Sequence, residues 1–338
     1  MSERGLEKPK RNWFRLILGL LISAVAIVVV LQVANWQDLG PTLARVKWQT
    51  YAAIVVFTLI FLGLRAIAWR KLLGDVPSVW QTFFALNEGY LLNNVLPFRA
   101  GEVARAALLA RQSKMSTTHV LSTIVVERAF DLVIAASLFL VTLGMVVQLD
   151  WARTVSTILL GVVLAGLVVL FIMARNAESI RTKIEKISEN KPFLKQNVMP
   201  HLLGLLEGFK SLTRPSQLIF GFLFILLSWV SAVTLYTTVL RAFVPGAPLL
   251  WGVFVDSFLA LGIAIPSAPA ALGTFEAAIV GALSLLGIDQ TTGLAYAILM
   301  HFMQFILTGF FGLMGLLLDA RSKNTDEASQ THREESLL

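Results

Sequence analysis

The chain has 338 residues, yet it contains no cysteine and only four histidines, at positions 119, 201, 301 and 332. The absence of cysteine excludes disulfides, thiolate chemistry and Cys-ligated metal, and the histidines do not have the spacing of metal ligands. Charged residues are also scarce, at 14% of the chain against roughly 25% in soluble domains. We therefore expect no cofactor and no metal.

Apolar residues are abundant. They make up 56% of the chain, and the mean hydropathy is +0.74. Several stretches approach the roughly 20 apolar residues that a helix needs to cross hydrocarbon. The sequence therefore predicts an all-α polytopic membrane protein. The net charge of +7 fits loops that face anionic lipid, so no nucleic acid is expected as a partner.

The apolar stretches predict six full crossings and two re-entrant helical hairpins in one integral membrane domain, residues 14–318. The crossings are 14–34, 51–64 with its extension 66–69, 119–147, 155–174, 216–240 and 291–318, and the hairpins are about 79–111 and 251–286. Residues 1–13 form a basic cytoplasmic N-terminus, and 175–215 an amphipathic cytoplasmic segment. The polar residues 319–338 predict a disordered cytoplasmic tail.

One pattern occurs in both hairpins. Pro97 and Gly101 are followed by Glu102, and Pro269 and Gly273 are followed by Glu276. Each copy interrupts an apolar segment, and three crossings separate the copies, so the pattern predicts an inverted repeat with a substrate site near the midplane. The alternative is that proline and glycine only end ordinary short helices.

The basic residues predict the orientation. On this topology 23 of the 28 Lys and Arg residues, Arg65 among them, fall on the cytoplasmic side. Four fall outside (Arg45, Lys47, Arg153 and Arg241), and Arg128 lies inside a crossing. The positive-inside rule then places both termini in the cytoplasm, with the chain in the cell membrane of a bacterium or archaeon.

The first hairpin carries a candidate anion site. Its helix restarts at Gly101, and Arg99 and Arg105 flank Glu102. Free amides at a helix start together with two guanidinium groups suit a phosphate. Asn94 precedes the turn, where a polar side chain is costly in hydrocarbon unless it has a partner. The alternative is a cytoplasmic loop with a solvated Arg–Glu pair.

Three ionisable residues lie within the third crossing. Glu127 and Asp131 share a helix face, and Arg128 is expected to meet either acid or a partner on the first hairpin. Each charge costs roughly 2.5–3.5 kcal/mol at the bilayer centre, so such residues line a cavity or form a structural salt bridge between helices.

The second hairpin carries only acids. Glu276 and Asp256 are the sole charges of its two helices, and each is interpreted as a cation, proton or amine site or as a capping acid. In the last crossing, His301 and Gln304 favour a hydrogen bond between helices.

Three stretches resemble the lysylphosphatidylglycerol synthetase transmembrane-region family. They are residues 93–105, 126–131 and 269–276. The resemblance implies a polytopic helical fold with re-entrant elements and a phospholipid-related task. The candidate site residues on these stretches are Asn94, Arg99, Gly101, Glu102, Arg105, Glu127, Arg128, Asp131, Pro269, Gly273 and Glu276.

Two features depart from the family. The synthases continue into a soluble catalytic domain, whereas this chain ends 20 residues past the last predicted crossing, so aminoacyl transfer is not expected. The second turn, 267–271, lacks the glycines common in the family.

Three functions remain open. The first is a flippase-like transporter that moves a phospholipid or lipid-linked phosphate head group between leaflets. The second is an integral-membrane transferase acting on a lipid carrier, and the third is a non-catalytic scaffold for an envelope-lipid enzyme. A membrane lipid is the expected partner in each case, and a homo-oligomer or a partner enzyme stays open.

Overall fold

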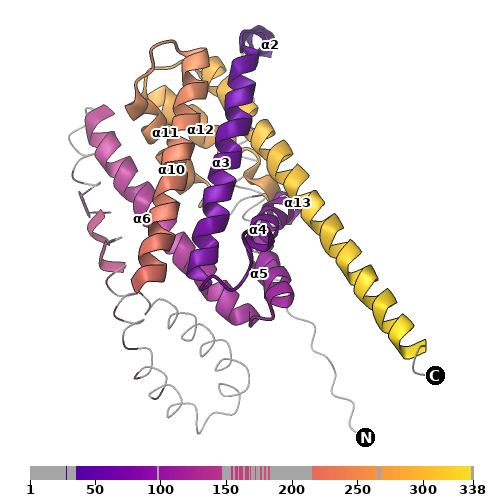
Figure 1. The fold of residues 1–338 in the computed structure, drawn as a ribbon. Coiled ribbons are helices and arrows are strands. Elements are labelled where there is room, and N and C mark those ends of the chain that lie inside the picture. Colours follow the sequence, from indigo (N-terminus) through magenta and orange to yellow (C-terminus); the bar gives the residue numbers. More distant parts are fainter. Residues whose placement is uncertain are drawn as a thin grey trace, which may run out of the picture.

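The computed structural model describes residues 36–96, 99–146, 215–264 and 268–335, with the side chains of α13 described to residue 320, and isolated residues at 28 and between 154 and 182 (Figure 1). The predicted crossings 14–34 and 155–174 and the segment 175–215 fall mainly outside these ranges. So do Pro97 at the first turn and residues 265–267 at the second. Those predictions stay predictions.

The described residues form helices and no strand, which confirms the all-α prediction. The elements are α2 (Trp36–Ala44), α3 (Trp48–Leu72), α4 (Val79–Val95), α5 (Ala100–Ser113), α6 (Thr117–Val146), α10 (Pro215–Phe243), α11 (Leu249–Gly262), the short 3-10 helix η3 (Pro269–Ala271), α12 (Thr274–Leu285) and α13 (Gln290–Glu335).

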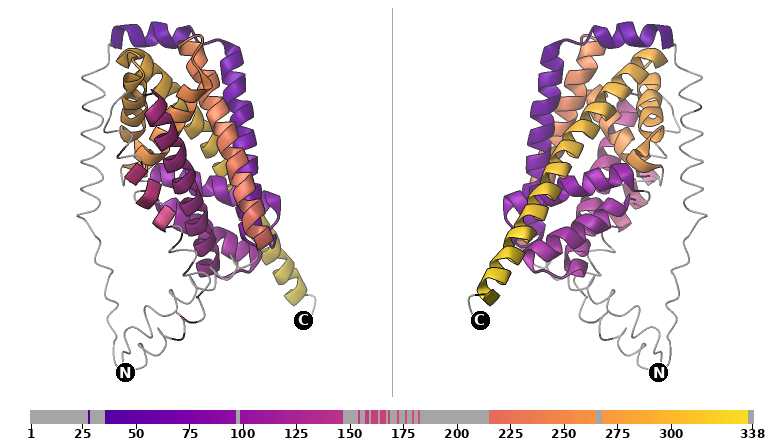
Figure 2. Two further views of the ribbon diagram at one scale, coloured as in Figure 1. Left: turned by 90° about the vertical axis from the view of Figure 1, so that its left-hand side faces the viewer. Right: turned by 90° about the vertical axis from the view of Figure 1, so that its right-hand side faces the viewer.

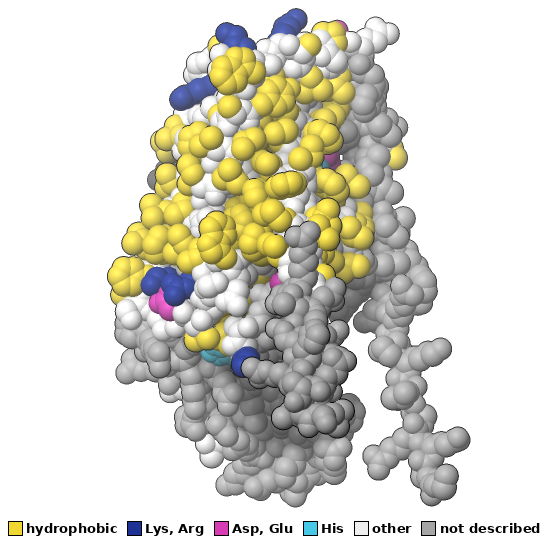
Figure 3. Space-filling model, turned by 45° about the vertical axis from the view of Figure 1, so that its right-hand side comes forward, with side chains coloured by type: hydrophobic (Ala, Val, Ile, Leu, Met, Phe, Trp, Pro, Cys, Tyr) yellow, Lys and Arg dark blue, Asp and Glu magenta, His cyan; other side chains and the backbone are white. Residues whose placement is uncertain are grey.

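Four of these helices are long and apolar enough to cross a membrane: α3, α6, residues 216–243 of α10 and residues 290–320 of α13. A helix of 25 residues such as α3 is about 37 Å long, which suffices for roughly 30 Å of hydrocarbon. Figure 3 shows one face of the molecule, where hydrophobic side chains cover the middle and basic side chains lie at the two ends. Exposed Trp48 and Trp80 lie at the first turns of α3 and α4, as residues of a membrane interface do.

The two hairpins begin and break where the local chemistry dictates. The Ser78 hydroxyl accepts a hydrogen bond from the Gln81 amide, and the Gln81 side chain accepts one from the Ser78 amide, which starts α4. The breaks carry strain. Arg99 before α5 and Ala270 and Ala271 in η3 have positive φ angles of 52°, 57° and 54°. Glycine adopts this region without steric cost, so the second turn keeps its shape without the family's glycines at some expense.

The last helix extends beyond the predicted crossing. Helix α13 continues through the polar residues 319–335. No glycine or proline interrupts residues 319–335, and residues with good helix propensity such as Ala320, Arg321 and Glu327 continue the helix.

The hairpins enter the bundle from opposite ends. Figures 1 and 2 place the α3–α4 and α5–α6 connections at one end and the α10–α11 and α12–α13 connections at the other. The tips meet inside the bundle, where η3 packs against α4. There the Arg99 Nη2 donates a hydrogen bond to the carbonyl of Ile263, at 2.6 Å.

The packing is the same in both halves. We call α3 to α6 the first half and α10 to α13 the second. Helix α3 packs on α10, and each other contact has a counterpart when the halves are exchanged: α3–α4 with α10–α11, α4–α5 with α11–α12, α5–α6 with α12–α13, and α4–α13 with α11–α6. This arrangement is the one that the duplicated Pro–Gly pattern leads us to expect.

The first hairpin closes at two glycines. A Cβ atom on Gly101 would overlap the carbonyl oxygen of Gly89 and lie 2.7 Å from the backbone nitrogen of Asn93. Because backbone cannot move aside as a side chain does, α4 and α5 approach this closely only with glycine at position 101.

We expect Gly101→Ala to lower the free energy of unfolding by about 1–3 kcal/mol, as overpacking of a close contact does. The control is Gly281→Ala on α12, where no atom lies within 4 Å of the new methyl group. That variant should be unchanged or more stable, by about 0.5–1 kcal/mol. Unfolding in detergent measures both, and equal stability of the two variants would contradict the close approach.

Candidate functional site

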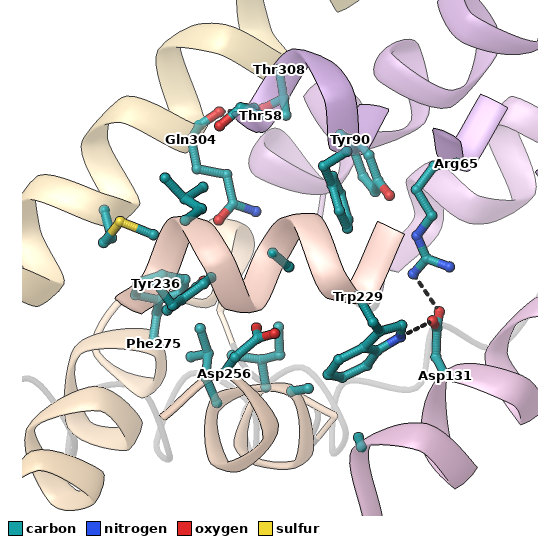
Figure 4. Close-up of a pocket in the computed structure, with 18 of the residues that line it drawn as sticks. Thr58, Arg65, Tyr90, Asp131, Trp229, Tyr236, Asp256, Phe275, Gln304 and Thr308 are labelled. Atoms are coloured by element: carbon teal, nitrogen blue, oxygen red, sulfur yellow. Dashed lines mark hydrogen bonds and ion pairs between the residues drawn. The ribbon is translucent and has the colours of Figure 1, made fainter. Parts of the chain in front are cut away.

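A cavity of about 450 Å³ lies where the hairpin tips meet, lined by both halves. Apolar side chains such as Ile54, Leu62 and Leu259 form much of its wall. Its polar side chains are Thr58, Arg65, Tyr90, Arg99, Glu102, Arg128, Asp131, Trp229, Tyr236, Asp256, Gln304 and Thr308. Figure 4 shows many of them pointing into the same space.

Buried ion pairs lie behind one end of the cavity. The fully buried Glu127 accepts a hydrogen bond from Arg105 Nη2 at 3.0 Å and lies 3.5 Å from Arg65 Nη1. Arg65 in turn donates to Asp131 at 2.6 Å. The Arg105 guanidinium lies 4.6 Å above the Trp69 ring, a cation–π contact. These pairs join α3, α5 and α6, so each charge has an opposite partner.

Two further arginines face the cavity. Arg128 Nε lies 2.9 Å from Glu102, and Arg128 Nη1 donates to Asp131 at 3.3 Å. Arg99 Nη1 lies 3.9 Å from Glu102. The side chains of Arg99 and Arg128 are 43% and 32% exposed, against 6% for Arg65. Both guanidinium groups are therefore within reach of an anion in the cavity.

The second half completes this end of the site. Trp229 on α10 donates its indole N–H to Asp131 at 3.1 Å (Figure 4). Asp131 therefore accepts hydrogen bonds from α3, α6 and α10. The whole cluster holds four arginines and three acids, and this excess of positive charge suits an anionic group such as a phosphate.

The other end of the cavity is polar with little charge. Asp256 is 7% exposed, and its Oδ2 has no hydrogen-bond partner among the described residues. Tyr236, Gln304 and Thr308 line the cavity around it (Figure 4). A buried carboxylate without a partner is costly unless a proton or a cation neutralises it. Across the described residues, no group of three His, Cys, Asp or Glu gathers as metal ligands would.

The predicted residues of the first half separate into two sets. Arg99, Glu102, Arg128 and Asp131 line the cavity. Arg105 does not, so the expected corner in which Arg99 and Arg105 hold one anion is not what the structure shows. The physical reason is that Arg99 precedes α5 in a left-handed conformation at the hairpin tip, whereas Arg105 lies inside α5 and points toward Glu127 and Trp69.

The remaining predicted residues lie outside the cavity lining. Gly101 is a packing glycine, and Asn94 lies in the last turn of α4. Pro269 begins η3, and Gly273, at φ 81°, donates its N–H to Glu276 at 2.8 Å. Glu276 also pairs with His301 on α13, at 2.6 Å.

Arg65 was not expected at the cavity, whereas the sequence already offered Asp256 as a cation, proton or amine site. Arg65, counted among the cytoplasmic bases, is buried inside α3. Its position in an otherwise apolar stretch between Tyr51 and Trp69 is the signal that places such an arginine inside the bundle. Asp256 is not a capping acid, because α11 begins seven residues before it. Nothing in the sequence singles out Trp229 or Tyr236.

The fold and the site define a helical membrane protein with an ionic cluster beside a cavity. Residues 16–312 match the model of the "Lysylphosphatidylglycerol synthase TM region" family, and the chain belongs to that family. It is 26% identical over 223 residues to a "UPF0104 membrane protein" of Methanocaldococcus jannaschii, covering 65% of this chain and 91% of that protein. It is 24% identical over 283 residues to another of Methanothermobacter thermautotrophicus, covering 78% and 83%. No solved structure matches the chain significantly.

We expect Arg65→Ala to lower the free energy of unfolding by about 3–5 kcal/mol, because it leaves buried carboxylates with too few partners. The control is Lys71→Ala on the same helix, where a partly exposed pair with Asp75 is worth about 1 kcal/mol or less. Unfolding in detergent measures both. Equal stabilities would mean that the buried cluster does not stabilise the bundle.

Proposed function

We propose that the protein is a flippase-like transporter that moves a phospholipid or lipid-linked phosphate head group between leaflets. The observation that carries this proposal is the cavity, where half-exposed Arg99 and Arg128 face a space with apolar walls. Guanidinium groups bind phosphate oxygens in a bidentate manner, and the apolar walls suit the adjoining lipid. The chain belongs to a family named for lysylphosphatidylglycerol synthase, an enzyme whose product is a phospholipid. This membership supports a lipid substrate.

The ion pairs suit reversible binding. Glu102 neutralises Arg128 and lies near Arg99. An entering phosphate competes with Glu102 for these two arginines, so binding replaces one anion by another at the guanidinium groups. Arg65 and Arg105 keep their own acids throughout, which holds the helices in place while the ligand changes.

The same proposal includes the membrane arrangement. Helices α4, α5, α11 and α12 have 17, 14, 14 and 12 residues, and each is shorter than the roughly 20 residues that cross a bilayer. We take them as re-entrant hairpins from opposite leaflets, with six crossings and both termini in the cytoplasm of a bacterium or archaeon. Moving Arg65, Arg99 and Arg105 into the bundle leaves 20 bases on the cytoplasmic side against four outside, so the positive-inside argument stands.

The topology is tested with single cysteines in this cysteine-free chain. Ser116 follows α5 and Ser284 lies near the end of α12, and both are exposed. We expect an impermeant thiol reagent added to intact cells to label Ser284→Cys and not Ser116→Cys, while permeabilised cells show both labelled. Labelling of Ser116→Cys from outside would overturn the proposed orientation.

Transport is tested by leaflet-resolved lipid transfer in reconstituted vesicles that offer anionic and zwitterionic phospholipids. We expect Arg99→Gln to slow transfer about tenfold, the loss expected for one hydrogen bond to a charged group. Arg99→Lys should retain more of the rate than Arg99→Gln because it keeps the charge. Arg111→Gln, which removes an exposed charge from α5, the helix that follows Arg99, is the matched control and should transfer at the wild-type rate.

Mass spectrometry of the same lipids separates the functions. Faster transfer than in protein-free vesicles, with unchanged lipid masses, supports the transporter. A changed lipid mass would instead support a transferase. Arg99→Gln vesicles as fast as the wild type would show that the cavity arginines do not bind the moving group.

A further inference from the structure

The two halves repeat residue by residue around the cavity. Cavity residues Thr58, Phe61 and Arg65 on α3 each have a cavity residue 171 positions later on α10, namely Trp229, Ala232 and Tyr236. Asp131 and Ala135 on α6 each have one 173 positions later on α13, namely Gln304 and Thr308. These constant spacings show that the two halves correspond in individual side chains as well as in the packing of their helices.

The same register pairs two interactions. Arg128 and His301 stand 173 positions apart on α6 and α13. Glu102 and Glu276 are both the third residue of the helix that follows the hairpin tip. Arg128 pairs with Glu102 at 2.9 Å, and His301 Nδ1 pairs with Glu276 Oε1 at 2.6 Å. Each half therefore joins its hairpin to the next long helix by an equivalent carboxylate–cation pair.

The two pairs differ in how they respond to protons. A guanidinium stays charged at any physiological pH, whereas the imidazole of histidine gains and loses its proton between about pH 5 and 8. Glu276 uses its other oxygen to accept the Gly273 amide at the start of α12. A change in the bond to His301 is therefore transmitted to the turn itself.

His301 also touches the cavity wall. The ring of Phe275 stacks on the imidazole, with the centroids 4.2 Å apart, and Phe275 lines the cavity. Glu276 and His301 themselves are largely buried, at 13% and 12% side-chain exposure. The pair therefore lies just behind the wall of the cavity, on the side of the second hairpin.

We propose that His301 and Glu276 form a proton-binding site that controls the second hairpin of the transporter. With the imidazole protonated, the ion pair holds α12 and Phe275 against α13 and keeps this side of the cavity closed. Loss of the proton leaves a weaker hydrogen bond from a neutral imidazole to the carboxylate and lets the hairpin open. The proposal rests on the proposed transport function, to which it adds a pH-dependent step.

The helices around α13 carry other titratable or charged groups. They are Glu276 on α12, Glu88 and Tyr90 on α4, Tyr236 on α10, Arg65 on α3 and the exposed Asp38 on α2. Within the described residues, the ion pair of His301 is with Glu276. The effect on the hairpin is therefore assigned to this pair: closure at pH values where the imidazole is protonated, opening as the pH rises and it loses the proton.

The test measures access to the cavity without measuring lipid. Ala260 lines the cavity on α11, and Ala260→Cys in the cysteine-free chain would be reconstituted in vesicles with equal pH on both sides. The rate at which an impermeant thiol reagent modifies this cysteine would be measured. Ser284→Cys, exposed at the end of α12, corrects for the pH dependence of the thiol itself. We expect the corrected rate to fall about fivefold from pH 8 to pH 5.5. The reason is that protonation puts a charge on the donor of the hydrogen bond from His301 to Glu276, which strengthens the bond and favours the closed hairpin.

Two substitutions of His301 fix the two states. His301→Arg reproduces the permanent pair of the first half, and the corrected rate should be low at every pH. His301→Gln keeps a neutral donor, and the rate should be high at every pH. A wild-type rate that does not change with pH, or equal rates for the two variants, would overturn the proposal.

Lipid transfer by the same vesicles separates this proposal from the proposed function. A pH-dependent thiol rate without lipid transfer supports the proton site and counts against the flippase. Lipid transfer with a pH-independent thiol rate supports the flippase and overturns the proton site.

Discussion

The structure depends on the cost of placing charge inside an apolar helical bundle. Glu127 is fully buried, and it is tolerated because Arg105 and Arg65 approach it from two other helices. Each of these arginines would be as costly alone as the acid is. The cluster therefore fixes how α3, α5 and α6 sit together, and the position of the first hairpin follows from it.

The buried pairs of Glu127 hold the helices in place beside a second group of charges, Arg128 and Asp131, that faces the cavity. Arg128 and Asp131 lie one helical turn or less from Glu127, but their side chains reach the cavity rather than the interior. Asp131 is held by Arg65 and by Trp229 of the second half, so it stays in place when Arg128 changes partner. A binding site at membrane depth needs this division, because an arginine that must also hold the fold together is not free to bind a ligand.

The sequence predicts the larger features because they depend on local chemistry. Proline lacks the backbone N–H that continues a helix, so Pro97 and Pro269, each followed four residues later by a glycine, predict the two breaks and their order in the chain. The ion-pair partners of charged side chains are harder to predict from the sequence, because they depend on which helices pack together. Arg128 pairs with Asp131 and Glu102 and not with adjacent Glu127, because neighbouring residues on a helix point about 100° apart. Arg65 was assigned to a loop because its acids are 62 and 66 residues away in the chain.

The two halves show how one fold can carry unequal chemistry. Their helices pack alike, yet Arg65, Arg128 and Asp131 correspond to Tyr236, His301 and Gln304. A cavity with the same charges at both ends would bind a phosphate equally at each, and equal binding gives no change in affinity along the path. Replacing these permanent charges by a tyrosine, a histidine and an amide leaves the second half with no arginine at the cavity, and its carboxylates there are Asp256 and, behind the wall, Glu276. On the proposed transport function, the asymmetry of these side chains on a repeated backbone would let the two ends of the cavity hold one head group with different strength.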